Sequence, residues 1–187
     1  MLRWLVPGAV WAIDGTWLDQ PVAPLGRRAL VVVELHSRKT LCVESVPGER
    51  AGAVIACLRR LIEKHGAPLV LKADNGSAFI AKCLARFCGS HGITLMHSPV
   101  RRPRWNGTCE VSGRWAKRRA VAAAALRGAS GGLCQADLDC AVTFCGIMPR
   151  IDDALRERFL ATVAQQLAAV VTAAVPEVAD EPSTEVR

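Results

Sequence analysis

Three acidic side chains occupy positions from which they could act together. Asp14 interrupts the apolar segment 10–17. Asp74 ends the apolar segment 69–73, and Glu110 comes 36 positions later. Carboxylates are hard oxygen ligands that suit Mg²⁺, and a pair of such ions can stabilise both the attacking and the leaving oxygen at a phosphodiester. Three adjacent carboxylates would repel one another without a metal, which disfavours a purely structural cluster.

Apolar periodicity predicts the elements that would position these acids. In a strand over 10–17, period-two geometry puts Asp14 on one face with its alternate neighbours. Asp74 falls at the C-terminal end of a buried strand, where α/β proteins place chemistry, and Glu110 falls near the start of a helix. The strands are expected at 10–17, 29–36, 40–46, 69–73 and 93–96, with a loop or hairpin at 20–26, and the helices at 51–65, 77–90, 108–126, 133–146 and 151–174.

The segment 97–106, just before the third acid, is rich in both arginine and proline. It carries Arg101, Arg102 and Arg104 among prolines, so it is expected to be neither core nor regular helix. Planar guanidinium groups bind phosphates well, which predicts contacts to a nucleic-acid backbone. A solvated basic loop is the alternative.

The helix predicted over 108–126 has two distinct faces. The side chains expected to point inward are Val111, Trp115, Ala122 and Leu126. The side chains that share a face with Glu110, at spacings of three and four, are Arg114, Lys117, Arg118 and Val121. Taken alone, this helix would favour a simple salt bridge between Glu110 and Arg114, and the two upstream acids argue for a ligand instead.

The composition narrows the class of protein. A length of 187 residues fits one domain with a small appendage. The formal net charge of +7 favours a polyanionic partner, with an ordinary basic protein as the alternative. The segment 176–187 is acidic and too poor in apolar side chains to order itself.

The eight cysteines show no CxxC pair, so neither a zinc knuckle nor a disulfide framework is indicated. They are expected to be small core hydrophobes in a reducing compartment. The apolar N-terminal run leads into Asp14 without a cleavage site, which favours a first strand over a signal peptide. No segment approaches the roughly 18 apolar residues that a membrane span needs.

The three acids and their surroundings resemble the catalytic core of the retroviral-integrase and insertion-element transposase superfamily, which has an Asp, Asp, Glu triad. The resemblance covers roughly residues 8–127. The matching residues around the second acid and before the third are Asn75, Gly76, Ser77, Phe79, Ser98, Pro99, Pro103, Asn106 and Gly107. The resemblance implies an α/β, ribonuclease H-like fold, in which a mixed five-stranded sheet has flanking helices.

The resemblance also implies Mg²⁺-dependent phosphodiester cleavage and strand transfer in DNA recombination or transposition. Two Mg²⁺ or Mn²⁺ ions would be held, with Asp14 bridging both and Asp74 and Glu110 each binding one. The residues expected to contact DNA are Arg101, Arg102, Arg104, Asn106, Arg114, Lys117 and Arg118. The expected setting is the cytoplasm, on the nucleoid, with DNA and further copies of the chain as partners and without a membrane.

The expected division of the chain is a catalytic core at 1–127, a helical extension at 128–175 and an acidic tail at 176–187. Superfamily members usually carry an N-terminal DNA-recognition module, and only nine residues precede Val10, so a separate recognition subunit or module is expected. The apolar residues spaced four apart along 151–174 are expected either to pack on or cap the core, or to form a surface for self-association. Two functional alternatives stay open: a truncated remnant that binds DNA without recombining it, and a ribonuclease H-like nuclease.

Overall fold

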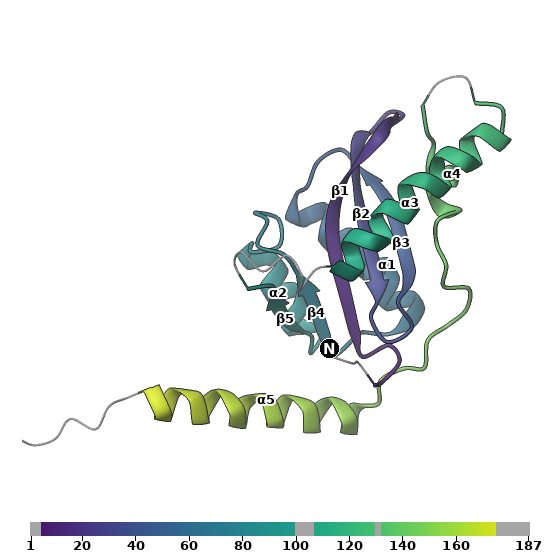
Figure 1. The fold of residues 1–187 in the computed structure, drawn as a ribbon. Coiled ribbons are helices and arrows are strands. Elements are labelled where there is room, and N and C mark those ends of the chain that lie inside the picture. The colour runs from purple at the N-terminus through teal and green to yellow at the C-terminus, as the bar shows by residue number, and fades with distance from the viewer. Residues whose placement is uncertain (1–4, 100–106, 130–131, 175–187) are drawn as a thin grey trace, which may run out of the picture. The chain divides into compact units, whose positions relative to one another are not determined.

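A five-stranded sheet carries helices on both of its faces (Figure 1). The computed structural model describes residues 5–99, 107–129 and 132–174, with side chains described as far as residue 166. The strands are β1 (Val10–Val22), β2 (Gly26–Glu34), β3 (Lys39–Val46), β4 (Val70–Ala73) and β5 (Thr94–His97). The helices are α1 (Ala51–His65), α2 (Lys82–Ser90), α3 (Gly107–Leu126), α4 (Gln135–Asp139) and α5 (Asp153–Ala174).

The strand order across the sheet is β3-β2-β1-β4-β5. β1 pairs antiparallel with β2 and parallel with β4, and β4 pairs parallel with β5. The mixed five-stranded sheet that the resemblance implied is therefore confirmed. In the parallel pair, Ala12 lies opposite Lys72. Continuing this register by two residues brings Asp14 level with Asp74, so the two acids lie beside each other where β4 ends.

The two faces of β1 have different surroundings. Trp11 and Ile13 are fully buried in a core that they share with residues of α1 and α2. Because side chains alternate along a strand, Asp14 and Thr16 project to the opposite face. That face is crossed by α3 (Figure 1). The strand thus gives one face to the core and the other to the acids.

A buried carboxylate fixes the start of β1. The Glu34 side chain is 1% exposed and accepts hydrogen bonds from the N–H groups of Gly8 at 3.2 Å, His36 at 3.0 Å and Ser37 at 2.7 Å. It also accepts one from the Ser37 hydroxyl at 2.6 Å. A buried acceptor with four donors ties the segment before β1 to the turn between β2 and β3.

α3 lies close to the sheet because its buried face consists of small residues. The residues buried on this face are Cys109, Gly113, Ala116, Ala120 and Ala124. The sequence predicted four inward-facing apolar residues on this helix, and this prediction is wrong because all four are exposed. They are Val111, Trp115, Ala122 and Leu126. Large side chains would hold the helix away from the strands, whereas glycine and alanine allow a close approach.

Two predicted boundaries near the sheet are wrong. β1 continues to Val22, so the hairpin that the sequence allowed over 20–26 turns only at residues 23–25. α2 begins at Lys82 instead of residue 77. The chain before it forms a separate turn, in which the N–H groups of Phe79 and Ile80 both donate to the Gly76 carbonyl.

The helix predicted over 133–146 is also wrong in length, because α4 spans only Gln135–Asp139. Beyond it, the N–H groups of Thr143 and Phe144 donate to the Thr40 carbonyl of β3 instead of continuing a helix. α4 packs against α3 and β3. Its buried Asp137 accepts a hydrogen bond from Arg127 at 2.7 Å, and this guanidinium holds the pKa of Asp137 well below its usual range.

The chain divides into two compact units, Met1–Ile151 and Asp152–Arg187. In the second unit, the Asp152 carboxylate accepts a hydrogen bond from the Leu155 N–H at 2.6 Å and caps the start of α5. The division at residues 127 and 175 that the sequence suggested stays a prediction. Among the described residues, no helix is both long and apolar enough to cross a membrane.

Candidate active site

Asp14 lies on β1 in a half-buried, strongly acidic environment. Burial is the largest cause of a rise in the pKa of the Asp14 carboxyl to about 7. The negative charges of Asp74, Glu49 and Glu110 also raise this pKa, while a hydrogen bond from the Gly15 backbone opposes them. Three other acids are therefore near enough to disfavour the charged form of Asp14, which is the situation that a bound cation would relieve.

Asp74 follows β4 directly, and its turn is anchored to the neighbouring strand. The Gly76 N–H donates to Asp74 Oδ1 at 2.9 Å, which closes a tight turn. The His97 ring nitrogen Nδ1 lies 3.0 Å from the Asp74 carbonyl oxygen, and Asn75 Nδ2 donates to the Ser98 carbonyl at 2.8 Å. The Asn-Gly turn therefore holds the second acid in a fixed place beside β5.

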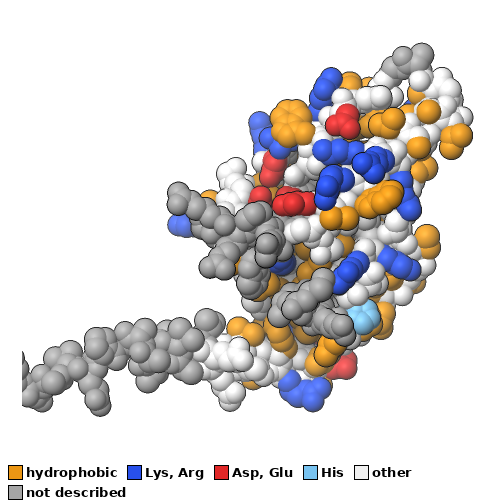
Figure 2. Space-filling model, in the orientation of Figure 1, with side chains coloured by type: hydrophobic (Ala, Val, Ile, Leu, Met, Phe, Trp, Pro, Cys, Tyr) orange, Lys and Arg blue, Asp and Glu red, His pale blue; other side chains and the backbone are white. Residues whose placement is uncertain are grey.

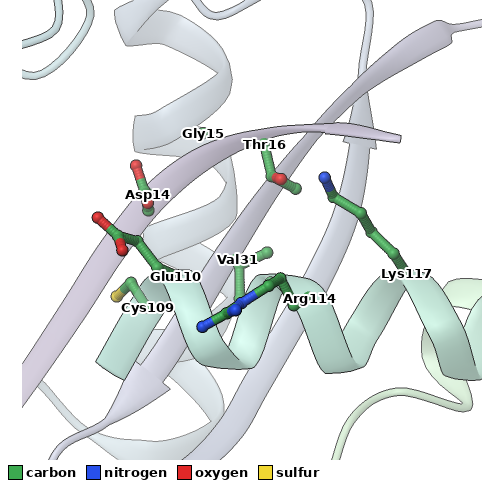
Figure 3. Close-up of a pocket in the computed structure, with 9 residues that line it drawn as sticks. Asp14, Gly15, Thr16, Val31, Cys109, Glu110, Arg114 and Lys117 are labelled. Atoms are coloured by element: carbon green, nitrogen blue, oxygen red, sulfur yellow. The ribbon is translucent and has the colours of Figure 1, made fainter. Parts of the chain in front are cut away.

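Glu110 comes from the first turn of α3, where it is exposed and opens onto the same site. In Figure 3 its carboxyl group points toward that of Asp14 across the gap between the helix and β1. The two acids border a pocket of about 420 Å³, whose lining residues are Asp14, Gly15, Thr16, Val31, Cys109, Glu110, Gly113, Arg114 and Lys117. The structure thus brings all three predicted acids together from three separate elements.

Two of the predicted DNA-contacting cations border this pocket. Arg114 and Lys117 follow Glu110 along one side of α3 (Figure 3). Figure 2 shows Lys and Arg side chains gathered over α3, beside acidic ones. Arg118 does not line the pocket, and its guanidinium lies over the Trp115 ring, 5.7 Å from the ring centre. The open site therefore combines acids that suit a metal with cations that suit a phosphate.

The other predicted DNA contacts are outside the described residues. They are Arg101, Arg102, Arg104 and Asn106. Their roles stay predictions.

Glu49 is a fourth acid of the site that the sequence did not single out. It lies in the connection between β3 and α1, and its Oε2 accepts a hydrogen bond from Arg28 at 3.0 Å. A Cβ added at Gly15 would come within 2.6 Å of the Glu49 carboxyl carbon, and one at Gly76 within 3.2 Å of its Oε1. Glu49 thus lies against Gly15, which directly follows Asp14 in β1, and beside Gly76, two residues after Asp74; at Gly15 a larger side chain would collide with it.

Cys109 and Lys72 form a buried layer beside the acids. Burial raises the pKa of the Cys109 thiol to about 12, and the charge of Asp14 adds to this rise. Burial lowers the pKa of the Lys72 ammonium group, which neighbours Cys109. The thiol is therefore protonated at neutral pH and forms an uncharged part of the pocket wall. In the sequence, only the position of Cys109 directly before Glu110 indicates that this thiol lies in the wall of the pocket.

The sequence is similar to those of known integrases. The family model described as "Integrase core domain" matches residues 6–103, which include Asp14 and Asp74 and end before Glu110. The Gag-Pol polyprotein of Gibbon ape leukemia virus is 30% identical over 114 residues, covering 59% of this chain. The chain spans only 6% of that polyprotein's length.

Solved structures agree with this similarity. The catalytic core domain of BIV integrase matches with a TM-score of 0.58 and 25% identity, covering 86% of this chain and 99% of that one. The HTLV-2 integrase catalytic core domain in complex with magnesium matches with a TM-score of 0.60 and 22% identity, over 74% of this chain and 85% of that one. A chain of the simian T-cell lymphotropic virus intasome matches with a TM-score of 0.65 and 20% identity, over 75% of this chain and 49% of that one. The family match extends over more than half of the sequence, and this chain therefore belongs to the integrase core domain family.

Proposed function

We propose that this chain catalyses metal-dependent cleavage and strand transfer at phosphodiester bonds of DNA. The observation that carries the proposal is the convergence of Asp14, Asp74 and Glu110 from β1, the end of β4 and the start of α3. Membership of the integrase core domain family supports the same reaction class.

The donor set fits hard divalent cations. Carboxylate oxygens are the ligands that Mg²⁺ and Mn²⁺ prefer. The raised pKa of Asp14 results from burial first and from the charges of neighbouring acids second, and a bound cation would offset both. When bound, a pair of these ions would stabilise charge on the attacking and leaving oxygens of the phosphodiester. Asp14, Asp74 and Glu110 are the residues that would hold these ions, with Asp14 positioned between the other two acids in the proposed site.

The basic side chains beside the three acids would position the nucleic acid. Arg114 and Lys117 border the pocket on the helix that carries Glu110, so a phosphate held by them would lie next to the carboxylates. Arg118 would extend the contact along α3, where it stacks on Trp115. We propose further contacts to the DNA backbone from the segment before α3, through Arg101, Arg102, Arg104 and Asn106. Positioning of the scissile bond by fixed cations is a large part of catalysis at phosphodiesters.

We also propose that the active form is a homo-oligomer that works with a separate DNA-recognition module. The HTLV-2 core domain is described in dimeric and trimeric forms, and the matching simian virus chain belongs to an intasome. These assemblies support the proposal for this chain by similarity. Sedimentation of the purified chain with and without DNA measures the oligomeric state directly.

The reaction is tested with a supercoiled plasmid and labelled oligonucleotides, in Mg²⁺ and in EDTA. We expect Mg²⁺-dependent nicking and joining, and we expect Asp14→Asn, Asp74→Asn and Glu110→Gln each to abolish both. Asp19→Asn is the matched control, because Asp19 is an exposed acid on the same strand as Asp14. Full activity of any triad variant would remove that residue from the mechanism. Nicking without joining would indicate a nuclease, and DNA binding without either would indicate an inactive remnant.

A further inference from the structure

Two cysteines and a glutamate meet on the side of the sheet that is packed by α1. Cys42 and Glu44 are two residues apart on the edge strand β3, so their side chains share a face. Cys57 comes from α1, and its sulfur lies 3.8 Å from that of Cys42. The Cys42 sulfur lies 4.0 Å from Glu44 Oε2, and all three ligand atoms lie within 4.8 Å of one another.

These distances are close to those of a tetrahedral metal site. With metal–sulfur bonds of about 2.3 Å, two sulfurs on one tetrahedral ion are about 3.8 Å apart. A carboxylate oxygen at about 2.1 Å from the ion would lie roughly 3.6 Å from each sulfur. Cys42, Cys57 and Glu44 therefore occupy approximately three corners of a tetrahedron. Cys42 and Glu44 are only half-buried, which leaves a path for an ion and a water ligand at the fourth corner.

The surrounding charges also suit a cation held by thiolates. Two thiolates and one carboxylate around a divalent ion carry a net charge of −1, and the Arg60 guanidinium is already paired with Glu44. Such an outer partner orients a ligand and compensates the excess charge. The Cys57 thiol lies within hydrogen-bond distance of the Cys42 sulfur, and binding of a divalent ion by the two cysteines as thiolates would release thiol protons.

We propose that Cys42, Cys57 and Glu44 bind a thiophilic divalent cation, with Zn²⁺ as the expected ion, and that this ion links the edge strand β3 to α1. The site is separate from the proposed catalytic one, because Cys42 packs with the core on the α1 side of the sheet whereas Asp14 faces α3. It goes beyond the proposed function and does not depend on it. A disulfide is the competing outcome, and it would require the two sulfurs to close from 3.8 Å to about 2.05 Å.

The test is a Co²⁺ titration of the full chain under reducing, oxygen-free conditions. We expect one equivalent of Co²⁺ to produce a thiolate-to-cobalt charge-transfer band and the intense visible bands of a tetrahedral site, both removed by Zn²⁺. Cobalt held only by carboxylates, as at Asp14, would give neither signal, so the readout is independent of the catalytic proposal.

Variants assign the ligands. Cys42→Ser is expected to lower the intensity of the charge-transfer band by half or more, because only the Cys57 thiolate remains, and Glu44→Gln to weaken Co²⁺ binding about tenfold or more. Cys140→Ser is the matched control, because Cys140 is an exposed thiol outside the cluster, and it should leave the titration unchanged. Circular dichroism verifies that each variant is folded. The proposal is overturned if the reduced wild-type chain gives no charge-transfer band or if Cys42→Ser gives the band at full intensity. It is also overturned if the chain isolates with a Cys42–Cys57 disulfide and the reduced form does not bind Co²⁺.

Discussion

Replacing Asp14 with Asn is expected to stabilise the metal-free protein at neutral pH. The folded protein holds the Asp14 carboxyl in a half-buried position among three other acids, and its pKa is about 7 instead of 3.8. Ionisation of this group therefore favours unfolding, because the carboxylate is better solvated in the unfolded chain. Asn keeps the shape of the side chain and carries no charge.

The size and the pH window follow from the same shift. One pKa unit corresponds to about 1.36 kcal/mol, so the shift sets an upper limit of about 4 kcal/mol. Partial solvation of Asp14 and relaxation of its neighbours reduce this to roughly 1–3 kcal/mol. Between pH 3.8 and about 7 the folded chain retains a proton that the unfolded chain has lost, so the wild-type free energy of unfolding falls as the pH rises. The advantage of Asn is therefore absent below pH 3.8 and complete above pH 7.

Urea denaturation in EDTA at pH 4, 6 and 8 measures this difference, with Asp19→Asn as the control on the same strand. Saturating Mg²⁺ should reverse the order, because a ligand that binds only the folded wild type stabilises it by mass action. A variant that is less stable than the wild type at pH 8 in EDTA would refute the electrostatic reasoning. An equal gain at every pH would refute its assignment to the titration of Asp14.

Three further substitutions test the packing. Gly15→Ala would place a Cβ 2.6 Å from the Glu49 carboxyl carbon, so we expect roughly a tenfold or greater loss of DNA cleavage. Adding Glu49→Ala should restore part of the activity, and a double variant without any recovery would contradict a steric cause. Ala120→Leu should destabilise the protein by roughly 1–3 kcal/mol in urea titrations because it overpacks the buried face of α3, whereas Ala122→Leu on the exposed face should change stability by less than about 0.5 kcal/mol. Glu34→Ala should cost about 3 kcal/mol in the same assay, since it leaves buried donors without their acceptor; a change below about 0.5 kcal/mol would show that water replaces the carboxylate.

The sequence predicted the elements whose periodicity is strong. The helix expected at 51–65 is α1, because its apolar residues recur at helical spacing and Gly66 follows it. The two-residue alternation of β1 correctly separated Asp14 from the core residues Trp11 and Ile13. In α3, however, alanines occur on several sides, so periodicity did not reveal that the smallest residues face the sheet.

Other parts of the molecule depend on contacts between distant segments. Glu49 lies in the connection after β3, and nothing in its local sequence indicates that its carboxyl group packs beside Gly15. Cys42 and Cys57 lack the short spacing of familiar zinc motifs, since one comes from a strand and the other from a helix. Tertiary packing alone brings such pairs together.

The central claim is that Asp14, Asp74 and Glu110 hold divalent metal ions. Anomalous X-ray diffraction from crystals of the protein grown with Mn²⁺ and DNA tests it most directly, because Mn²⁺ takes the same oxygen ligands as Mg²⁺ and is located by its own scattering. We predict two anomalous peaks about 4 Å apart, both within about 2 Å of Asp14 oxygens, one also bound by Asp74 and the other by Glu110. Well-ordered carboxylates with no peak between them, or manganese bound only elsewhere on the chain, would contradict the claim.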